Sequence, residues 1–528
     1  MTSSAIIPNA IEPIADLPID DGLAAALLNS VAEYGAQLHG RRVWLACSGG
    51  RDSLTLAALC VQLYRQGQLP FLPQLLHVDH RLQADSQHWA VHVANWAQAQ
   101  QIPCYILSAQ VKGHDEQAAR QARYDVMRAH INQEDVLLLG HHADDQAETV
   151  LMRLIQGAGV NGLSGMQPWR IQTQGAHRIA LWRPWLTVQR ASISAYAQCL
   201  KLPYIDDPTN NTGDNVRSGL RRDIMPVLAK YNPNVIDNIA RSAQLLGDAE
   251  ATIRAQAVQD LQQTVMSSLQ LPPAQRVLNI DELETLPLYR QRQLLHYWLG
   301  QDEPLPPTKQ LIDEVLGLSQ RKDHDHQTEL FWQGRKQSYI IRRYRQQLYR
   351  LSSEWLTWLK MPLEAQTYNL SDLIVAAAHS ADNPSVSISL RTSKHFTWQV
   401  QMLPHALAEM LKIDTDKVEI KIAPLDRQQR VQIAGSSRPQ SGKKLYQTLG
   451  VPIWLRESLV VVSVVLLNEE STEQSKNESV KDIPILLMSP FDSWILGQIL
   501  DSDDFIRHSE NDAFSKYIHN HLSVDNSC

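Results

Sequence analysis

The sequence predicts an α/β fold in which a Rossmann-like parallel sheet is followed by a mainly helical middle domain and a small α+β C-terminal domain. Short apolar runs alternate with longer helical stretches from about residue 24 to 225, which is typical of a parallel sheet with crossover helices. Amphipathic helical stretches dominate residues 236–350, and short alternating runs return from residue 385. The length of 528 residues allows about three domains of ordinary size.

The first domain, predicted at residues 24–230, contains apolar runs that indicate buried strands. Polar residues follow the first, second and fourth runs: Ser48, then His77 to His80, then Gly140 to His142. Because ligand loops of parallel sheets lie at the carboxyl ends of the strands, these residues predict one shared site. The runs are Val43–Cys47, Gln74–Val78, Tyr105–Leu107 and Val136–Leu139.

The rest of the chain is predicted in four parts. Helices at 238–263 and 286–299 define the middle domain at 236–350. Residues 385–467 combine strands at 386–390, 397–402 and 418–422 with a helix at 443–449, which indicates an α+β module. Residues 468–482 are rich in Glu, Ser, Asn and Lys and predict a disordered linker. The tail, 483–528, receives no assignment.

The composition argues against several classes of protein. Hydrophobic residues at 44% and charged residues at 20% are ordinary for a globular protein. The longest aliphatic run, near residues 459–467, is far shorter than the ~20 residues that span a bilayer. The acidic N-terminal segment does not resemble a signal peptide, so we expect a cytoplasmic protein without a membrane partner. The 5 cysteines include no C-x-x-C pair, so neither a disulfide framework nor a zinc site is predicted.

The string Ser48-Gly49-Gly50-Arg51-Asp52-Ser53 lies between a predicted strand and the helical stretch Leu54–Gln66. Adjacent glycines let the backbone approach an anion, the helix N-terminus presents unpaired N–H groups, and the two serines add hydroxyl donors. The string lacks the lysine and the spacing of a Walker A loop. It therefore predicts a phosphate site whose chemistry is not γ-phosphoryl transfer; the alternative is a glycine-rich turn without a ligand.

A second polar string, Gly140–Thr149, follows the fourth predicted strand. If a helix begins near Asp144, Asp145 and Glu148 lie three residues apart and share a face of it. Paired carboxylates suit Mg²⁺ and equally suit the ammonium of a small amine substrate. The alternative is a helix-capping aspartate followed by an exposed acidic turn.

Two further patterns have plain structural alternatives. Arg120 and Arg123 follow Glu116 at helical spacing, where ion pairing on a surface competes with a role near phosphate. His77 and His80 would point to opposite faces of a strand end, and no third ligand is evident. Zinc binding is therefore not predicted for this pair.

Basic residues gather in two places although the formal net charge is −7. Residues 217–222 contain Arg217, Arg221 and Arg222, and residues 335–350 combine basic residues with tyrosines and contain no acidic residue. A charge run is usually a solvated face, and only its combination with the phosphate loop favours contact with RNA. The longer run consists of Arg335, Lys336, Arg342, Arg343, Arg345 and Arg350 with Tyr339, Tyr344 and Tyr349.

The string at 48–53 resembles the S-G-G-x-D-S loop of the N-type ATP pyrophosphatases, the PP-loop superfamily. The order of strings resembles the tRNA(Ile)-lysidine synthetase family, with high specificity over about residues 40–230. One string differs from the family pattern. Where the family usually has Arg-Asn-x-Ile/Leu-Arg, this chain has Arg217–Arg221, with Ser218 in place of the asparagine. The resemblance rests on Ser48–Ser53, His77–His80, Glu116–Tyr124, Gly140–Thr149 with Arg153, Gly157, Gly162, Leu163 and Gly165, Arg183–Leu186, Asp206–Asn210, Arg342–Arg345 with Leu348 and Tyr349, Gly435–Arg438, Lys443–Leu445 and Pro452–Arg456.

The resemblance implies an ATP-dependent ligase that joins free L-lysine to C2 of the wobble cytidine of the CAU-anticodon tRNA(Ile), through an adenylated cytidine and with release of AMP and pyrophosphate. It implies ATP and Mg²⁺ as cofactors. The roles it implies are ATP binding by Ser48, Gly49, Gly50, Arg51, Asp52, Ser53 and His77; catalysis by Asp52, Arg120, Arg123, Asp145 and Glu148; Mg²⁺ binding by Asp52 and Glu148; lysine binding by Asp145 and Glu148; and tRNA binding by Arg217, Arg221, Arg342, Arg343, Arg345, Arg438, Lys443 and Lys444.

Three alternatives stay open. A tRNA thiolase of the same superfamily would share the loop, but the kind with paired C-x-x-C cysteines is disfavoured by their absence. An amide-forming synthetase would need an ammonia supply, and no glutaminase signature precedes the loop. A non-catalytic RNA-binding module would not require Asp52, Asp145 and Glu148. The sequence does not decide whether His141 or His142 accepts the proton of the amine, nor the oligomeric state, for which a homodimer is one option.

Overall fold

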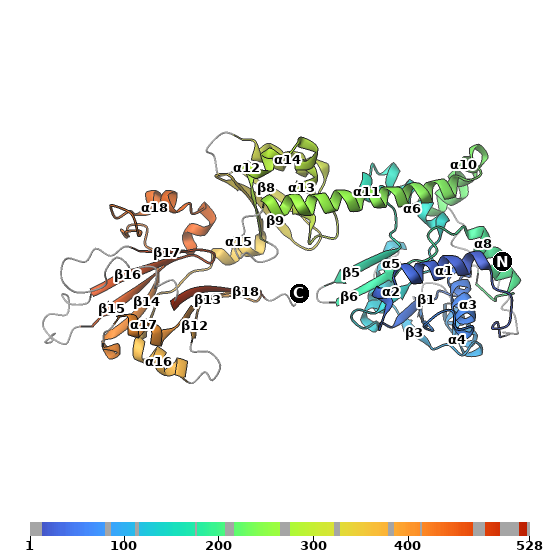
Figure 1. The fold of residues 1–528 in the computed structure, drawn as a ribbon, viewed down its shortest axis with the longest axis horizontal. Coiled ribbons are helices and arrows are strands. Elements are labelled where there is room, and N and C mark those ends of the chain that lie inside the picture. The colour runs from blue at the N-terminus through green and yellow to red at the C-terminus, as the bar shows by residue number, and fades with distance from the viewer. Residues whose placement is uncertain are drawn as a thin grey trace. The chain divides into compact units, whose positions relative to one another are not determined.

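The structure is a computed structural model that describes residues 13–79, 86–110, 116–174, 177–205, 216–264, 275–321, 328–378, 385–411, 414–467, 481–496 and 517–524. The chain divides into two compact units, Met1–Ile253 and Arg254–Cys528. The helices and strands of both can be followed by colour and label in Figure 1. Within the described ranges, no helix combines the length and the apolar character that crossing a membrane requires.

The first unit is built on a six-stranded sheet of order β3-β2-β1-β4-β6-β5. Its strands are β1 (Val43–Ala46), β2 (Gln74–Asp79), β3 (Cys104–Ser108), β4 (Val136–Leu138), β5 (Trp169–Gln174) and β6 (His177–Trp182). Its helices are α1 (Asp21–Glu33), α2 (Gly35–Leu38), α3 (Arg51–Arg65), α4 (Ser86–Ala99), α5 (Glu116–His130), α6 (Ala143–Ile155), α7 (Val160–Leu163), α8 (Arg190–Cys199), α9 (Val216–Gly219), the π-helical turn η2 (Leu220–Ile224), α10 (Met225–Tyr231) and the start of α11 (Val235–Thr264).

The prediction of a parallel sheet is confirmed. β1 pairs in parallel with β2 and β4, β2 with β3, and β4 with β6, while the edge strand β5 is antiparallel to β6. Successive strand residues face opposite sides: Leu45 and Leu75 pack in one core with α1, α3, α4 and α8, and Trp44 and Leu76 pack in another with Met127 of α5. Because both faces are covered, the strands read as continuous apolar runs.

The direction of strand order changes between β1 and β4, in the middle of the sheet. From β1 the chain continues outward to β2 and β3, and then returns to β4 on the other side of β1. The loops that follow β1 and β4 therefore begin side by side, at the carboxyl ends of two adjacent parallel strands. In open α/β sheets, ligands bind at this switch point.

The middle part of the chain contains the predicted helices, here α11, α12 (Ile280–Thr285), α13 (Leu288–Gly300) and α14 (Lys309–Ser319). They are accompanied by an antiparallel sheet of order β7-β10-β9-β8, which the helical pattern does not predict. The basic run suggests a charged surface, whereas Tyr339 and Ile341, which lie in the same strand as Arg342, are fully buried. The strands are β7 (Arg276–Asn279), β8 (Glu329–Gln333), β9 (Ser338–Tyr344) and β10 (Gln347–Ser352).

The C-terminal part contains two antiparallel sheets, of orders β11-β14-β15-β16-β17 and β12-β13-β18. The strands are β11 (Gln366–Asn369), β12 (Val386–Thr392), β13 (Phe396–Met402), β14 (Val418–Pro424), β15 (Val460–Leu466), β16 (Lys481–Met488), β17 (Ser493–Ile495) and β18 (Ile518–Val524). The helices are α15 (Ser353–Leu359), α16 (Leu370–Ala378), α17 (Pro404–Leu411), η3 (Thr415–Lys417), α18 (Gly442–Leu449) and η4 (Ile453–Ser458).

The segment after residue 480 takes part in both of these sheets. β16 pairs with β15, and β18 pairs with β13. The assignment of Lys481 and Asp482 to a linker is therefore wrong, since both lie in β16, and the tail that received no assignment supplies three strands. Residues 468–480 of the predicted linker lie outside the described residues. The predicted strands at 386–390, 397–402 and 418–422 and the helix at 443–449 are confirmed.

A buried arginine anchors the middle sheet to the loop after α13. Arg350 is fully buried, and its two terminal nitrogens donate to Asp302 Oδ1 and Oδ2 at 2.7 and 2.8 Å. Its guanidinium also lies 4.3 Å from the centre of the Tyr339 ring. The paired carboxylate and the ring together offset the cost of burying this charge.

We expect Asp302→Ala to lower the unfolding free energy of the second unit by roughly 3 kcal/mol, because it removes the charged partner of a buried guanidinium. A urea transition of the full chain, followed by tryptophan fluorescence, measures the change. The matched control is Asp313→Ala, whose partners Lys309 and Arg292 lie at the surface; its transition should hardly move. Equal shifts in the two variants would contradict the structural role of Asp302.

Candidate active site

The loop after β1 is closed by its own hydroxyl groups. Ser53 Oγ accepts from Ser48 N and donates to Gly50 O, and Gly50 N donates to Ser48 Oγ, each at 3.2 Å. Gly49 has a φ of +83°, and a Cβ there would lie 2.9 Å from Val93 Cγ2. Only glycine fits both conditions, so a side chain at position 49 would disturb the loop that leads into α3.

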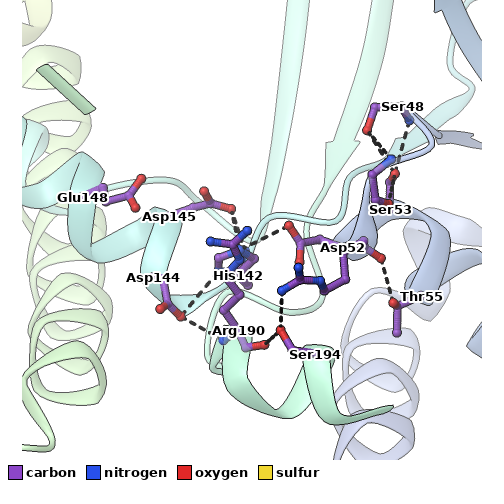
Figure 2. A network of polar contacts seen from close by, with 12 residues as sticks. Ser48, Asp52, Ser53, Thr55, His142, Asp144, Asp145, Glu148, Arg190 and Ser194 are labelled. Carbon is purple, nitrogen blue, oxygen red and sulfur yellow. Dashed lines mark hydrogen bonds and ion pairs between the residues drawn. The ribbon is translucent and has the colours of Figure 1, made fainter. Parts of the chain in front are cut away.

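The loop after β4 rests directly on the first turn of α3. A Cβ on Gly140 would lie 3.3 Å from the carbonyl carbon and oxygen of Asp52 and 3.4 Å from Ser53 Cα. A larger residue at 140 would push these two segments apart. The close approach brings Asp52, from the first predicted string, next to His142 from the second (Figure 2).

His142 lies among three carboxylates. Its Nε2 is 3.6 Å from Asp52 Oδ2 and 3.4 Å from Asp145 Oδ2, and its Nδ1 is 3.5 Å from Asp144 Oδ2 (Figure 2). Burial alone would lower the pKa of His142, but the hydrogen bonds to Asp144 and Asp52 and the charge of Asp145 raise it to about 10. His142 is therefore an imidazolium at neutral pH and links the two strings through charge.

His141 has the opposite character. His141 is half-buried, and its Nδ1 accepts a hydrogen bond from Arg183 Nε at 3.2 Å. Burial lowers the pKa of His141 to about 3, and the positive charges of Arg183 and Arg120 act in the same direction. A neutral His141 has its acceptor nitrogen occupied, and a cationic His142 has no lone pair. In this state neither histidine can accept the proton of an amine.

Glu148 is held by two arginines. Arg221 Nε and Nη2 donate to Glu148 Oε1 and Oε2 at 2.6 and 3.0 Å, and Arg217 Nε lies 3.3 Å from Oε2. Arg221 Nη2 also lies 3.7 Å from Asp145 Oδ1. Asp145 and Glu148 therefore share a face of α6 as predicted, but their partners here are guanidinium groups.

Two residues that were predicted to bind ATP, Arg51 and His77, contact neighbouring parts of the chain. Arg51 Nη1 donates to Ser194 Oγ at 3.0 Å, and its guanidinium lies 4.7 Å from the centre of the Tyr204 ring. A ring nitrogen of the buried His77 is bonded to Cys47 O at 2.9 Å. Both contacts fix the loop between β1 and α3 against neighbouring elements.

The predicted catalytic arginines lie on α5. Arg120 is exposed, lies 5.3 Å from the centre of the Tyr124 ring, and is close enough for its charge to lower the pKa of His141. Arg123 is half-buried on the same helix. His80 and Asp206–Asn210, which carry part of the family resemblance, lie outside the described residues.

One carboxylate oxygen is suited to a cation. Asp52 Oδ1 is buried and has no hydrogen-bond partner within the described part of the chain, a state that a protein interior disfavours. Glu148, the other predicted Mg²⁺ ligand, has both oxygens bonded to Arg221. No three His, Cys, Asp or Glu side chains among the described residues are grouped to hold a metal, so Mg²⁺ would take its other ligands from water and phosphate.

A pocket of about 110 Å³ opens beside Glu148. Its wall combines carboxylates, guanidinium groups and apolar side chains, so it can contact a ligand that has both charged and aliphatic parts. It is lined by Asp144, Glu148, Arg190, Arg221, Met225 and Ile236.

Three site residues were not predicted. Arg183 faces His141, Arg190 N donates to Asp144 Oδ2 at 2.9 Å, and Asp144 contacts His142. Arg183 stands in one of the strings that carry the family resemblance, and this was the signal that could have identified it. Nothing in the local pattern distinguishes Arg190 from an ordinary helix-starting residue.

In the second unit, the predicted tRNA-binding residues fall into two groups. Arg342 pairs with Glu329 and lies 5.2 Å from the centre of the Trp454 ring, and Arg345 donates to the carbonyl of Gln447. Arg343 is bonded within its own turn. Arg345 is nevertheless exposed, as are the three residues of the other group, Arg438, Lys443 and Lys444. The interleaved tyrosines of the basic run are buried core residues, which excludes them as stacking surfaces for bases.

The fold and the site together define a PP-loop domain, in which a serine- and glycine-containing anion loop lies at the switch point of a parallel sheet. Residues 23–228 match the PP-loop domain, and residues 278–349 match the TilS substrate binding domain. The tRNA(Ile)-lysidine synthase of Psychrobacter sp. (strain PRwf-1) is 39% identical over 510 residues, which cover 90% of this chain and 94% of that protein.

Two further relatives are similar over shorter lengths. The tRNA(Ile)-lysidine synthase of Pseudomonas aeruginosa is 37% identical over 59% of this chain and 69% of its own. That of Acinetobacter baylyi is 34% identical over 58% of this chain and 62% of its own. This chain belongs to the tRNA(Ile)-lysidine synthase family.

The charge of His142 predicts a dependence of stability on pH. Its pKa is raised from 6.5 to about 10 in the folded chain, so its stabilising contribution is complete below the unfolded pKa and is lost as the pH rises through the folded pKa. We expect the difference in unfolding free energy between the wild type and His142→Gln to shrink between pH 7 and pH 10. Urea unfolding without divalent cations measures it, and a difference independent of pH would contradict the imidazolium.

Proposed function

We propose that this chain is an ATP-dependent ligase that joins the ε-amine of free L-lysine to C2 of the wobble cytidine in the CAU-anticodon tRNA(Ile). The observation that supports the proposal is that His142 contacts both Asp52, beside the PP-loop, and Asp144, which lines the pocket. We place the reaction in the cytoplasm, where both tRNA and free lysine are present.

The proposed reaction has two steps. Cytosine O2 attacks the α-phosphorus of ATP, the bond to the β-phosphate breaks, and pyrophosphate leaves. The lysine amine then attacks C2, the C2–O2 bond breaks, AMP leaves with O2, and the amine gives up a proton. Adenylation is required because the cytosine carbonyl oxygen is otherwise a poor leaving group.

The loop after β1 would bind the pyrophosphate part of ATP through backbone N–H groups and the Ser48 and Ser53 hydroxyls. Arg120 and Arg123 would supply positive charge to the phosphates. Asp52 would hold Mg²⁺, as its unpartnered buried oxygen suggests; the metal would offset the negative charge that collects on the leaving group.

The pocket beside Glu148 would hold the amino acid. Asp145 and Glu148 would bind an ammonium group, Arg190 would face a carboxylate, and the apolar wall would contact the methylene chain. Since His141 and His142 lack an available acceptor nitrogen, the proton of the amine would pass to a carboxylate or to water.

The proposal is tested by incubating the chain with bulk tRNA, ATP, Mg²⁺ and each labelled amino acid in turn. We expect only lysine to become RNA-bound, and Asp52→Ala to reduce that signal at least a hundredfold while the fold is retained. Asp125→Ala, an exposed carboxylate on α5, serves as the control and should stay active. Labelling of RNA by another amino acid, or none by lysine, would contradict the proposal.

Lys443 and Lys444 of α18 should supply tRNA affinity. Replacing both with glutamine should weaken tRNA binding and reduce its dependence on log salt by up to about two units, at roughly 0.7–0.9 for each phosphate that the protein no longer neutralises, with kcat at saturating tRNA unchanged. The control removes two other exposed lysines of the second unit, Lys360 and Lys394, and therefore the same charge. An unchanged slope in the first variant would show that its lysines face only water.

A further inference from the structure

The amine-binding carboxylates already have positively charged partners. Glu148 is almost completely buried, and both its oxygens accept from Arg221, while Arg217 lies 3.3 Å from one of them and donates to Thr149 Oγ1 at 2.9 Å. A buried carboxylate without such partners would be strongly destabilised. The two arginines therefore stabilise the site when no amine is bound.

The same contacts oppose the binding of an amine. A bidentate guanidinium occupies one in-plane lone pair on each Glu148 oxygen, and Arg217 lies 3.3 Å from Oε2, so few acceptor sites are left for an incoming ammonium. Arg221 also forms part of the pocket wall. An additional cation placed beside Arg217 and Arg221 would be repelled by both, so the amine can use Glu148 fully only after at least Arg221 has moved away.

The segment that contains Arg217 and Arg221 has features that favour a change of conformation. They lie on the four-residue helix α9 and on the π-helical turn η2, and a π turn can revert to the more stable α register, which rotates the side chains along it. Gly219, at the junction, has open space where a Cβ would point, so close packing does not explain the glycine. Val216 and Ile224 are exposed at either end, and Leu220 between them is the apolar side chain of this segment that is buried, so a single apolar anchor holds it.

When a nucleotide is bound, Arg221 would have an alternative anionic partner nearby. Burial acts to lower the pKa of Arg221, but the hydrogen bond to Glu148 and the charges of Asp145 and Asp52 raise it above its usual value. Asp52 stands in the first turn of α3, next to the anion loop. A polyphosphate in that loop would bring several negative charges close to Asp52, whose own charge already acts on Arg221.

We propose that Arg217 and Arg221 form a latch on Glu148 that opens when the polyphosphate of the nucleotide binds, so that the amine binds after the nucleotide. The inference rests on the proposed function, because it assigns Glu148 to the amine. It makes the nucleotide and the amine positively coupled ligands, and such coupling must be reciprocal.

Equilibrium dialysis with labelled lysine tests the latch on the full chain. For the wild type we expect lysine to bind roughly tenfold more tightly when the loop is saturated with an ATP analogue that cannot be cleaved between the α- and β-phosphates, a typical size for such coupling. In Arg221→Gln, lysine should bind more tightly without the analogue, and the ratio should fall towards one. Arg222→Gln, an exposed neighbour on η2 paired with Asp223, should keep the wild-type ratio.

Three results would overturn the latch. The first is equal lysine affinity with and without the analogue in the wild type. The second is an Arg221→Gln variant that binds lysine more weakly in both states with an unchanged ratio, which would mean that Arg221 only positions Glu148. The third is a gain in lysine affinity from tRNA alone and none from the analogue.

The test does not depend on one variant or on turnover. If Arg221→Gln does not fold, the wild type still decides the matter, because lysine must tighten binding of the analogue by the same factor as the analogue tightens binding of lysine. Lysine incorporation into tRNA without coupling would reject the latch and keep the proposed function. Absence of lysine incorporation would reject the proposed function itself.

Discussion

The contact of Gly140 with the backbone of Asp52 is the constraint on which the rest of the site depends. It holds the loop after β4 against the first turn of α3, and so joins two strings that are about ninety residues apart in the sequence. Only because this approach is close can one imidazole, His142, contact carboxylates from both. The proposed phosphate site and the proposed amine site are thereby parts of one charged network.

In that network, each carboxylate has a positively charged partner that a ligand could replace. Buried carboxylates need positively charged partners. Here His142 is the partner of Asp52, Asp144 and Asp145, and arginines are the partners of Glu148. Each ligand of the proposed reaction carries a charge that can replace one of these internal partners: a metal at Asp52 and an ammonium at Glu148. A site of this kind is stable when empty and still has affinity for substrates, because binding exchanges one ion pair for another.

The second unit shows that residue type alone does not identify an RNA surface. Arg342 and Tyr349 have the composition of a nucleic-acid contact, yet the first pairs with Glu329 beside the Trp454 ring and the second is buried with its ring 4.9 Å from that same ring. Lys443 and Lys444 look equally ordinary in the sequence, but they are exposed on a short helix. Burial, which depends on the partner strand or helix, separates the two groups.

The sequence by itself determined the first four strands of the first unit, the glycine loop before α3 and the paired carboxylates on α6, because periodicity, glycine pairs and helical spacing are local properties. It did not indicate β5 and β6. The tertiary structure decided what depends on pairing between distant segments. Strand β18 joins β13, and Arg221 reaches Glu148 across 73 residues of chain. It also made His142 a cation and His141 a neutral acceptor, although the two are adjacent. Charge state and partner are set by what surrounds a side chain in space, and neighbours in the sequence do not supply that information.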